Sequence, residues 1–440
     1  MLGKRPLDVD ICTAAVPEEI KAVAKKQGWP TFEVGAAFGT IVVVCGGKNY
    51  EVTTFRKEIY GQDSHRPELV TFSQSLEEDL ARRDFTVNAL CMDRNGQLID
   101  LFGGLEDLRE GVLRTVGEAS RRFSEDGLRM FRAARFIAKL GFSLDEGILP
   151  AIQKNRERVQ GLSVERVREE VEKTLTAPFV VKGLSILMDS GLLGASCRGR
   201  EEGRDYPVDI LPEAVPLKGL PQNPRHHSLD VWSHTLHVVE QVPACPVLRW
   251  AALLHDIGKG RPGVRGLNRR GELSDHGHEQ EGAQLAALIL ERLKVEKTIS
   301  RQVVWLVRNH MQVLLAEERQ VKRWLRKVAK DFRTAEEFWQ GIGHWCALGR
   351  ADRYAKHLSA DASLNPLHQK VRQVLAQLPF YPSQLAIGGK DIADIVGAGP
   401  QVRHLQAVLL ERLQAGQLEN QRESLMSAVR QWFMRQQKER

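Results

Sequence analysis

Two aspartates near the start of the chain, Asp8 and Asp10, have the spacing of a metal-binding pair. They lie in the apolar, β-branched run LDVDICT, which predicts a strand, and side chains two residues apart on a strand point to the same face. Both carboxylates could therefore hold one pair of divalent cations. Two such cations serve phosphoryl or nucleotidyl transfer, because they stabilise the attacking and leaving oxygens together. An Asp-x-Asp pair on a surface strand is also compatible with two solvated carboxylates.

A third carboxylate for the same site is Glu51. It lies in the β-branched run YEVTTFR, which follows a glycine turn at Gly46 and Gly47. This pattern predicts a hairpin turn and a strand that neighbours the first one. We expect Glu51 to complete the catalytic set with Asp8 and Asp10.

Three further segments carry a family resemblance. They are residues 77–90 (EEDLARRDFTVNAL), residues 100–108 (DLFGGLEDL) and residues 122–136 (RFSEDGLRMFRAARF). In this order and spacing they closely resemble the bacterial class of tRNA nucleotidyltransferases and poly(A) polymerases. The resemblance spans nearly the whole chain and implies a polymerase-β-type head.

The resemblance also implies roles for single residues. Asp8 and Asp10 would bind Mg²⁺, and Arg83 would contact the phosphates of the incoming CTP or ATP. Asp126 and Arg129 would read the edge of the base, since residues three apart on a helix are neighbours and a guanidinium fork suits that edge. The arginines that continue the series turn around the helix and suit the triphosphate or a neighbouring segment better than the base. These are Arg132 and Arg135.

One segment of the family pattern is missing. The family places a Gly-Gly-x-Val-Arg-Asp loop shortly before a Leu-Gly-Lys-x-Pro segment, and its backbone amides cradle the triphosphate. This sequence opens directly at Met1-Leu2-Gly3-Lys4-Arg5-Pro6. Two explanations are open: the start codon has been assigned too far downstream, or the head has lost its phosphate cradle. An otherwise intact pattern favours the first.

A second cluster of metal-ligand types lies in the C-terminal half. Histidines in separate apolar helical runs, an adjacent His-Asp pair and a distant aspartate resemble the HD superfamily of metal-dependent phosphohydrolases. The set is His234, His255, Asp256, His278, His310 and Asp352. Imidazole and carboxylate together suit Mn, Ni, Fe, Zn or Mg with open positions for water. Lys259 would lie beside the scissile phosphate.

Composition limits the possible classes of protein. The chain has 440 residues, 42% of them hydrophobic and 27% charged, and a formal net charge of +7. A positive charge has the sign that RNA requires. Six scattered cysteines without a Cys-x-x-Cys motif predict reduced thiols in a cytoplasmic protein. No apolar stretch reaches about 18 residues, so we expect no membrane span, and no obligate protein partner is evident.

The spacing of hydrophobic residues divides the chain into two parts. Short β-branched runs alternate with turns up to about residue 118, and helical spacing follows to the C-terminus. The sequence thus predicts an α+β fold, with a polymerase-β-type head before an all-α body that contains an HD domain. The expected units are a truncated head (1–118), a helical neck for nucleotide recognition and RNA binding (119–194), a linker rich in glycine and proline (195–225), the HD domain (226–360) and a helical tail (361–440).

The expected function is addition of C and A from CTP and ATP to tRNA 3′ ends, with a second, metal-dependent phosphohydrolase activity. Two alternatives stay open. Poly(A) addition uses the same motifs. An HD phosphodiesterase or phosphatase whose head only binds RNA would also carry both sets of residues.

Overall fold

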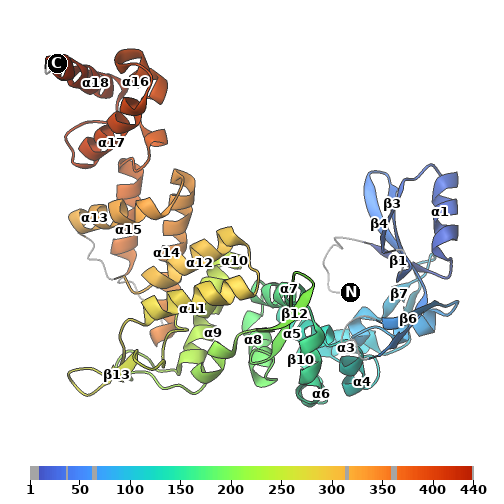
Figure 1. The fold of residues 1–440 in the computed structure, drawn as a ribbon. Helices are drawn as coiled ribbons and strands as arrows, with labels where there is room; N and C mark the ends of the chain where they lie inside the picture. The colour runs from blue at the N-terminus through green and yellow to red at the C-terminus, as the bar shows by residue number, and fades with distance from the viewer. Residues whose placement is uncertain (1–8, 36–37, 62–66, 313–316, 358–363, 439–440) are drawn as a thin grey trace.

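The structure of the chain is a computed structural model, which describes residues 9–35, 38–61, 67–312, 317–357 and 364–438. It is an elongated, hooked molecule with the head at one end and the C-terminal helices at the other (Figure 1). The α+β prediction is confirmed, because strands and short helices mix in the N-terminal part and helices dominate the rest. Among the described residues, no helix combines the length and apolarity that crossing a bilayer requires.

A four-stranded sheet of order β1-β4-β3-β2 forms the base of the head. The elements are β1 (Asp10–Thr13), β2 (Thr31–Gly35), β3 (Thr40–Cys45), β4 (Lys48–Thr54) and the helix α1 (Pro17–Lys26), which packs on one face. Gly46 and Gly47 have φ angles of +57° and +74°, as a tight two-residue hairpin turn requires. The predicted turn is confirmed. β1 runs parallel to β4, so that Asp10 is paired with Glu51.

Short elements connect this sheet to the neck. They are β5 (Arg56–Tyr60), β6 (Pro67–Phe72), α2 (Leu76–Ala81), η2 (Thr86–Asn88), β7 (Leu90–Met92), β8 (Leu98–Asp100) and α3 (Gly104–Glu110). Asp100 accepts hydrogen bonds of 2.9 Å from the backbone N–H groups of Gly104 and Leu105 and so anchors the start of α3. A Cβ at Gly104 would lie 2.3 Å from the Thr86 carbonyl oxygen, so this position needs glycine.

The neck is a cluster of helices. It contains α4 (Ala119–Glu125), α5 (Leu128–Leu140), α6 (Ile148–Asn155), η3 (Arg156–Gly161), α7 (Val164–Leu175) and α8 (Val180–Asp189), with the short strands β9 (Val112–Leu113) and β10 (Ser143–Leu144). α5 buries its apolar stripe against α7 and α8. Two of its arginines, Arg129 and Arg132, reach the head, where they donate hydrogen bonds to the carbonyl oxygen of Arg82 and to Asp84.

The segment 195–225, which was expected to be a linker, contains regular secondary structure. These residues form a hairpin of β11 (Ser196–Glu201) and β12 (Arg204–Asp209), followed by η4 (Pro212–Leu217). The turn residues Glu202 and Gly203 both have positive φ, and Cys197 and Val208 bury their side chains in the main core. Prolines and glycines suggested a linker because they also mark tight turns. Together with β9, β10 and a second hairpin at residues 265–275, this hairpin interrupts the expected all-helical body.

The HD part and the neck share one hydrophobic core, which runs from Phe85 to Phe380. The HD elements are α9 (Val231–Gln241), α10 (Pro246–Leu254), β13 (Arg265–Leu267), β14 (Leu273–Asp275), α11 (His278–Arg292), α12 (Lys297–Asn309), α13 (Glu318–Val328), η5 (Ala329–Asp331), α14 (Ala335–His357) and α15 (Leu364–Gln377). α15 therefore packs with the HD helices rather than with the tail. The core crosses the expected boundaries near residues 118, 225 and 360.

A separate small core begins at Leu385. It joins η6 (Pro382–Gln384), α16 (Gly389–Val396), α17 (Pro400–Gln414) and α18 (Arg422–Lys438). These helices form the end of the molecule farthest from the head (Figure 1). The tail is therefore an independent packing unit that starts about 25 residues later than the sequence suggested.

Candidate functional site

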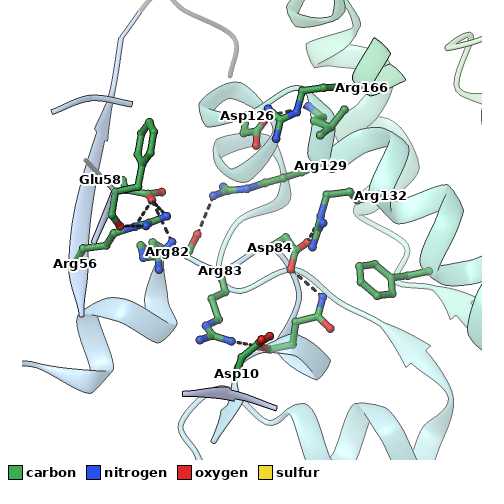
Figure 2. Close-up of a pocket in the computed structure, with 14 residues that line it drawn as sticks. Asp10, Arg56, Glu58, Arg82, Arg83, Asp84, Asp126, Arg129, Arg132 and Arg166 are labelled. Carbon is green, nitrogen blue, oxygen red and sulfur yellow. Dashed lines mark hydrogen bonds and ion pairs between the residues drawn. The ribbon is translucent and has the colours of Figure 1, made fainter. Parts of the chain in front are cut away.

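A cleft of about 850 Å³ opens between the head and the neck (Figure 2). Strand β5 and the segment after α2 face helices α5 and α7 across it. Its lining contains six arginines and four carboxylates: Arg56, Arg82, Arg83, Arg129, Arg132 and Arg166, with Asp10, Glu58, Asp84 and Asp126. Cations are in excess and all are guanidinium groups, which bind phosphates in a planar, bidentate manner. The cleft therefore suits a phosphate-rich ligand.

Asp10 and Glu51 lie together at the edge of this cleft. They are directly paired residues of parallel strands, so their side chains point to the same face of the sheet. Asp10 lines the cleft, whereas Glu51 is exposed beside it. The predicted partner Asp8 lies outside the described residues. Two carboxylates on one face offer the oxygen ligands that Mg²⁺ prefers.

Arg83 lies on the floor of the cleft near Asp10 (Figure 2). Its guanidinium donates a hydrogen bond of 2.9 Å to the carbonyl oxygen of Asn88 and lies 3.5 Å from Asp79. These two contacts hold the side chain across the base of the cleft. The guanidinium of Arg83 thus lines the cleft.

Two arginines that the sequence did not single out line the cleft from β5 and from the position after α2. Arg56 and Arg82 share the carboxylate of Glu58, at 2.7 and 3.1 Å. Burial, together with repulsion from Arg82, lowers the pKa of Arg56. A bound anion would relieve this repulsion. The EEDLARR segment at 77–83 gave no sign of Arg56, which reaches the cleft from β5.

Asp126 and Arg129 do not lie on one helix as expected. α4 ends at Glu125 and α5 begins at Leu128, so Asp126 occupies the break between them. Its Oδ1 accepts a hydrogen bond of 2.9 Å from the N–H of Leu128. Gly127 interrupts the helix, which the spacing argument overlooked. Both side chains nevertheless line the cleft.

Arg129 is a buried side chain with structural partners. It is 6% exposed and donates hydrogen bonds of 3.1 and 2.8 Å to the carbonyl oxygens of Arg122 and Arg82 and one of 2.8 Å to Glu125. These contacts fix it between the neck and the segment after α2. If Arg129 contacts the base, it can do so only through the part of its guanidinium that faces the cleft.

Arg132 points into the cleft from the next turn of α5. Its Nε donates a hydrogen bond of 2.6 Å to Asp84, and the same carboxylate accepts one of 3.0 Å from the side chain of Asn88. Asp84 thereby sets the positions of two residues that line the cleft. In the sequence, the only sign that Asp84 belongs to the site is its position next to Arg83.

Arg135 lies away from the cleft lining. It donates a hydrogen bond of 2.6 Å to Glu170 of α7, and its guanidinium is 4.3 Å from the ring centre of Phe136. The bond to Glu170 ties α5 to α7, whereas Phe136 is the next residue of α5 itself. Arg166, which extends from α7 beside Asp126, lines the cleft instead (Figure 2). Burial lowers the pKa of Arg166, and the charge of Asp126 opposes this effect.

The six predicted HD residues converge in the body. They form two buried triads in which all ligand atoms lie within 4.8 Å of one another: His234, His255 and Asp352, and Asp256, His278 and His310. The segments that supply them are α9, the turn after α10, α11, the end of α12 and α14. Asp256 connects the triads, since one carboxylate oxygen is 3.3 Å from Nε2 of His255 and the other is 3.3 Å from Nε2 of His278.

The imidazoles are oriented as metal ligands. Nδ1 of His255, His278 and His310 lies 2.8, 2.6 and 2.7 Å from the backbone carbonyl three residues earlier, which holds each Nε2 toward the centre. The Nε2 atoms face one another at 3.2 Å (His278 and His310) and 3.4 Å (His234 and His255). Nitrogens about 2.0–2.1 Å from a shared cation lie about 2.9–3.4 Å apart. The triads therefore fit divalent metal ions.

Burial and charge act differently on the groups of the triads. For His255, burial alone would lower the pKa, but the carboxylates of Asp256 and Asp352 raise it. Burial lowers the pKa of His234 and His310 and keeps these rings neutral. Burial alone would raise the pKa of Asp256, but His255 and Lys259 hold it well below its usual range. Lys259 lies 2.8 Å from Asp256, and the side chain of Lys356 lies 2.7 Å from Asp352.

A pocket of about 410 Å³ opens over the triads and places both lysines beside them. Lys259 was expected here. Lys356 was missed, although it follows Asp352 by one helical turn. His227 also lines the pocket, with its ring 5.1 Å from that of His234, and burial lowers its pKa to about 3.

Comparison with known families places three regions of the chain. Residues 1–114 match the poly(A) polymerase head domain, residues 141–196 match the probable RNA- and SrmB-binding site of polymerase A, and residues 225–335 match the HD domain. The first of these ranges contains Asp10, Glu51 and Arg83, and the last contains five of the six HD ligands; Asp352 lies beyond it.

Known relatives match the chain over its whole length. A CCA-adding enzyme of Geobacillus stearothermophilus is 35% identical over 439 residues, which is 99% of this chain and 90% of the relative. One from Geobacillus thermodenitrificans is 34% identical over 440 residues. The crystal structure of the Bacillus stearothermophilus CCA-adding enzyme in complex with CTP superposes with a TM-score of 0.64 at 28% identity and covers all of this chain and 92% of that one. The chain therefore belongs to the family of CCA-adding enzymes, nucleotidyltransferases with a polymerase-β-type head, and it carries an HD domain.

Proposed function

We propose that the chain adds C and A from CTP and ATP to the 3′ ends of tRNA. The observation that carries this proposal is the pairing of Asp10 with Glu51 at the edge of an arginine-lined cleft. The names of the full-length relatives and the CTP complex of the similar structure support it. Mg²⁺ held by Asp10, Glu51 and Asp8 would lower the pKa of the 3′ hydroxyl and neutralise the departing pyrophosphate.

The other residues of the cleft would bind the nucleotide, each group of them contacting a different part of it. Arg83, with Arg56 and Arg82, faces the position of the triphosphate and draws negative charge into the cleft. Asp126 and Arg129, held at the break between α4 and α5, face the base, where a carboxylate and a guanidinium match the donors and acceptors of cytosine or adenine. Arg132, which is held by its hydrogen bond to Asp84, would contact the sugar and phosphates of the nucleotide.

The test is direct. The full chain is incubated with tRNA that lacks its terminal CCA, with Mg²⁺ and with labelled CTP or ATP, and the products are sized on a sequencing gel. We expect two C residues and one A. Long A tracts would identify a poly(A) polymerase instead, and no addition by a folded protein would leave the head as an RNA-binding module. Glu110→Ala, at the exposed end of α3 and outside the cleft lining, is the control for Asp10→Ala.

We also propose a phosphohydrolase activity of the HD part. The observation that favours it is the facing arrangement of Nε2 atoms in two carboxylate-linked triads. Mn, Ni, Fe, Zn or Mg bound there would supply an activated water. Lys259 and Lys356 would bind the phosphate, since both ammonium groups flank the pocket.

This second proposal is tested on the full chain, because the neck and the HD helices share one core. Metal content is measured by mass spectrometry, and hydrolysis of a phosphomonoester and a 2′,3′-cyclic nucleotide is followed with each metal in turn. We expect bound metal and turnover; His255→Ala should remove the metal of its own triad and abolish turnover. A protein that binds no metal and hydrolyses neither ester would contradict the proposal and leave the six residues as packing.

A further inference from the structure

Two thiols lie side by side in the head, next to the cleft but outside its lining. Cys12 of β1 and Cys91 of β7 have sulfur atoms 3.7 Å apart although 79 positions separate them in the chain. Both side chains are partly exposed, and both are free thiols. Neither takes part in the proposed transfer reaction.

The geometry brings this pair close to a covalent bond. A disulfide needs an S–S distance of about 2.05 Å, so the sulfurs must approach by roughly 1.6 Å. β1 belongs to the four-stranded sheet and β7 to a two-stranded sheet with β8. A bond between Cys12 and Cys91 would therefore join two units that are hydrogen-bonded separately.

The two thiols differ in acidity: the hydrogen bond with Cys91, together with burial, raises the pKa of Cys12, so that Cys91 is the thiolate and Cys12 the proton donor. A hydrogen bond from Cys12 lowers the pKa of Cys91 to about 7, and the charge of Arg83 acts in the same direction against burial. Thiolates, not thiols, attack peroxides. The Cys91 thiolate would cleave the O–O bond and become a sulfenic acid as hydroxide leaves. Attack by the Cys12 thiol on that sulfur then forms the disulfide, and in total two thiols and one hydrogen peroxide give one disulfide and two waters.

The position of the pair connects it to the cleft. Cys12 follows Asp10 by two residues on β1, and Cys91 follows Asn88 by three. Asn88 accepts the hydrogen bond of Arg83 through its carbonyl group. Drawing the two sulfurs together would shift the strand that carries Asp10 relative to the segment that holds Arg83. A displacement of about 1 Å at a reacting centre can reduce a rate by about a hundredfold.

We propose that Cys12 and Cys91 are a redox modification site, which a peroxide closes to a disulfide and a dithiol reductant reopens, and that closure slows nucleotide transfer. The second half of this statement rests on the proposed function. The first half rests only on the two sulfur positions, and the two halves are tested by separate measurements.

The first measurement is chemical. The reduced full-length protein is treated with one equivalent of hydrogen peroxide, alkylated and digested, and its cysteine peptides are identified by mass spectrometry. We expect a Cys12–Cys91 disulfide, while Cys45 and Cys245, which are partly exposed in the same way, stay alkylated. Equal alkylation of all four thiols, or separate sulfinic acids at Cys12 and Cys91, would overturn the site.

The second measurement is kinetic. Addition of CTP to the truncated tRNA should be at least about tenfold slower in the disulfide form and should recover after dithiothreitol. Cys12→Ser and Cys91→Ser should keep their rates through the same treatment. A disulfide that forms without changing the rate would overturn the regulatory half. A reduced protein that adds no nucleotide would count against the proposed function alone, because the peptide masses still decide whether the disulfide forms.

Discussion

Asp84→Asn tests how the cleft positions its arginines. Asp84 is 7% exposed, and its Oδ2 accepts the hydrogen bond of 2.6 Å from Nε of Arg132. Its Oδ1 accepts from Asn88 and from the backbone N–H of Phe85. In the variant, an amide oxygen keeps the Oδ1 contacts, and the amide NH₂ then faces the N–H of Arg132. The change therefore removes one contact and leaves the others.

The size of the effect follows from burial. A hydrogen bond between charged groups contributes about 1.5–3 kcal/mol. The side chain of Arg132 is 33% exposed and can recover part of this in water, so we expect a loss of about 1.5–2 kcal/mol. If Arg132 contacts the nucleotide in its present position, the same energy is lost from the transition state. That corresponds to a decrease of about 10- to 30-fold in kcat/KM.

The assay is single-nucleotide addition to truncated tRNA, with urea unfolding measured on the same samples. Asp145→Asn is the matched control, because Asp145 also accepts from an arginine Nε, at 3.1 Å, but its side chain and that of Arg114 are 35% and 45% exposed and lie outside the cleft lining. We expect the control to lose less than about 1 kcal/mol of stability and no activity.

A double-mutant cycle with Arg132→Gln tests whether Asp84 affects nucleotide transfer through Arg132. If Asp84 acts through Arg132, the double variant should be about as slow as the slower single variant, since both remove the same interaction. Independent, additive losses would refute this link. So would an unchanged kcat/KM in Asp84→Asn.

Three further predictions address other parts of the molecule. Asp10→Ala should abolish nucleotide addition without changing the unfolding curve, because the side chain is exposed at the cleft edge; measurable incorporation would reject its catalytic role. Asp256→Asn should reduce bound metal at both triads, as measured by mass spectrometry, because one carboxylate faces both; loss at a single triad would contradict the bridging arrangement. Burial lowers the pKa of His368 from 6.5 to about 4, so the unfolded chain binds more protons between these values and stability should fall as the pH drops from 6.5 to 4. His368→Leu should flatten that decrease in urea unfolding relative to the exposed control His404→Leu, and parallel curves would disprove the assignment.

Local patterns predicted much of the head. The alternation around Asp10 and Glu51 indicates two strands, and the turn at Gly46 and Gly47 indicates that the second strand is preceded by a hairpin. These features depend on residues a few positions apart, which a strand or a turn brings together by itself. The HD residues were predictable for a related reason: each one's type and helical setting are visible locally.

Other features depend on tertiary structure. The pairing of Asp84 with Arg132 spans 48 positions, and that of Cys12 with Cys91 spans 79. The hairpin at 196–209 looked like a linker because the burial of its alternate side chains is set by the neck on which they pack.

The separation into units was also decided by packing. Helical spacing around residues 118, 225 and 360 shows where elements begin and end, but not which neighbours their apolar faces contact. In the folded chain those faces form one core from Phe85 to Phe380 and a second from Leu385 onward. The sequence by itself determined which residues could do chemistry and in which kind of element they lie. The tertiary structure decided which of them meet, because register and packing join residues whose separation along the chain carries no local signal.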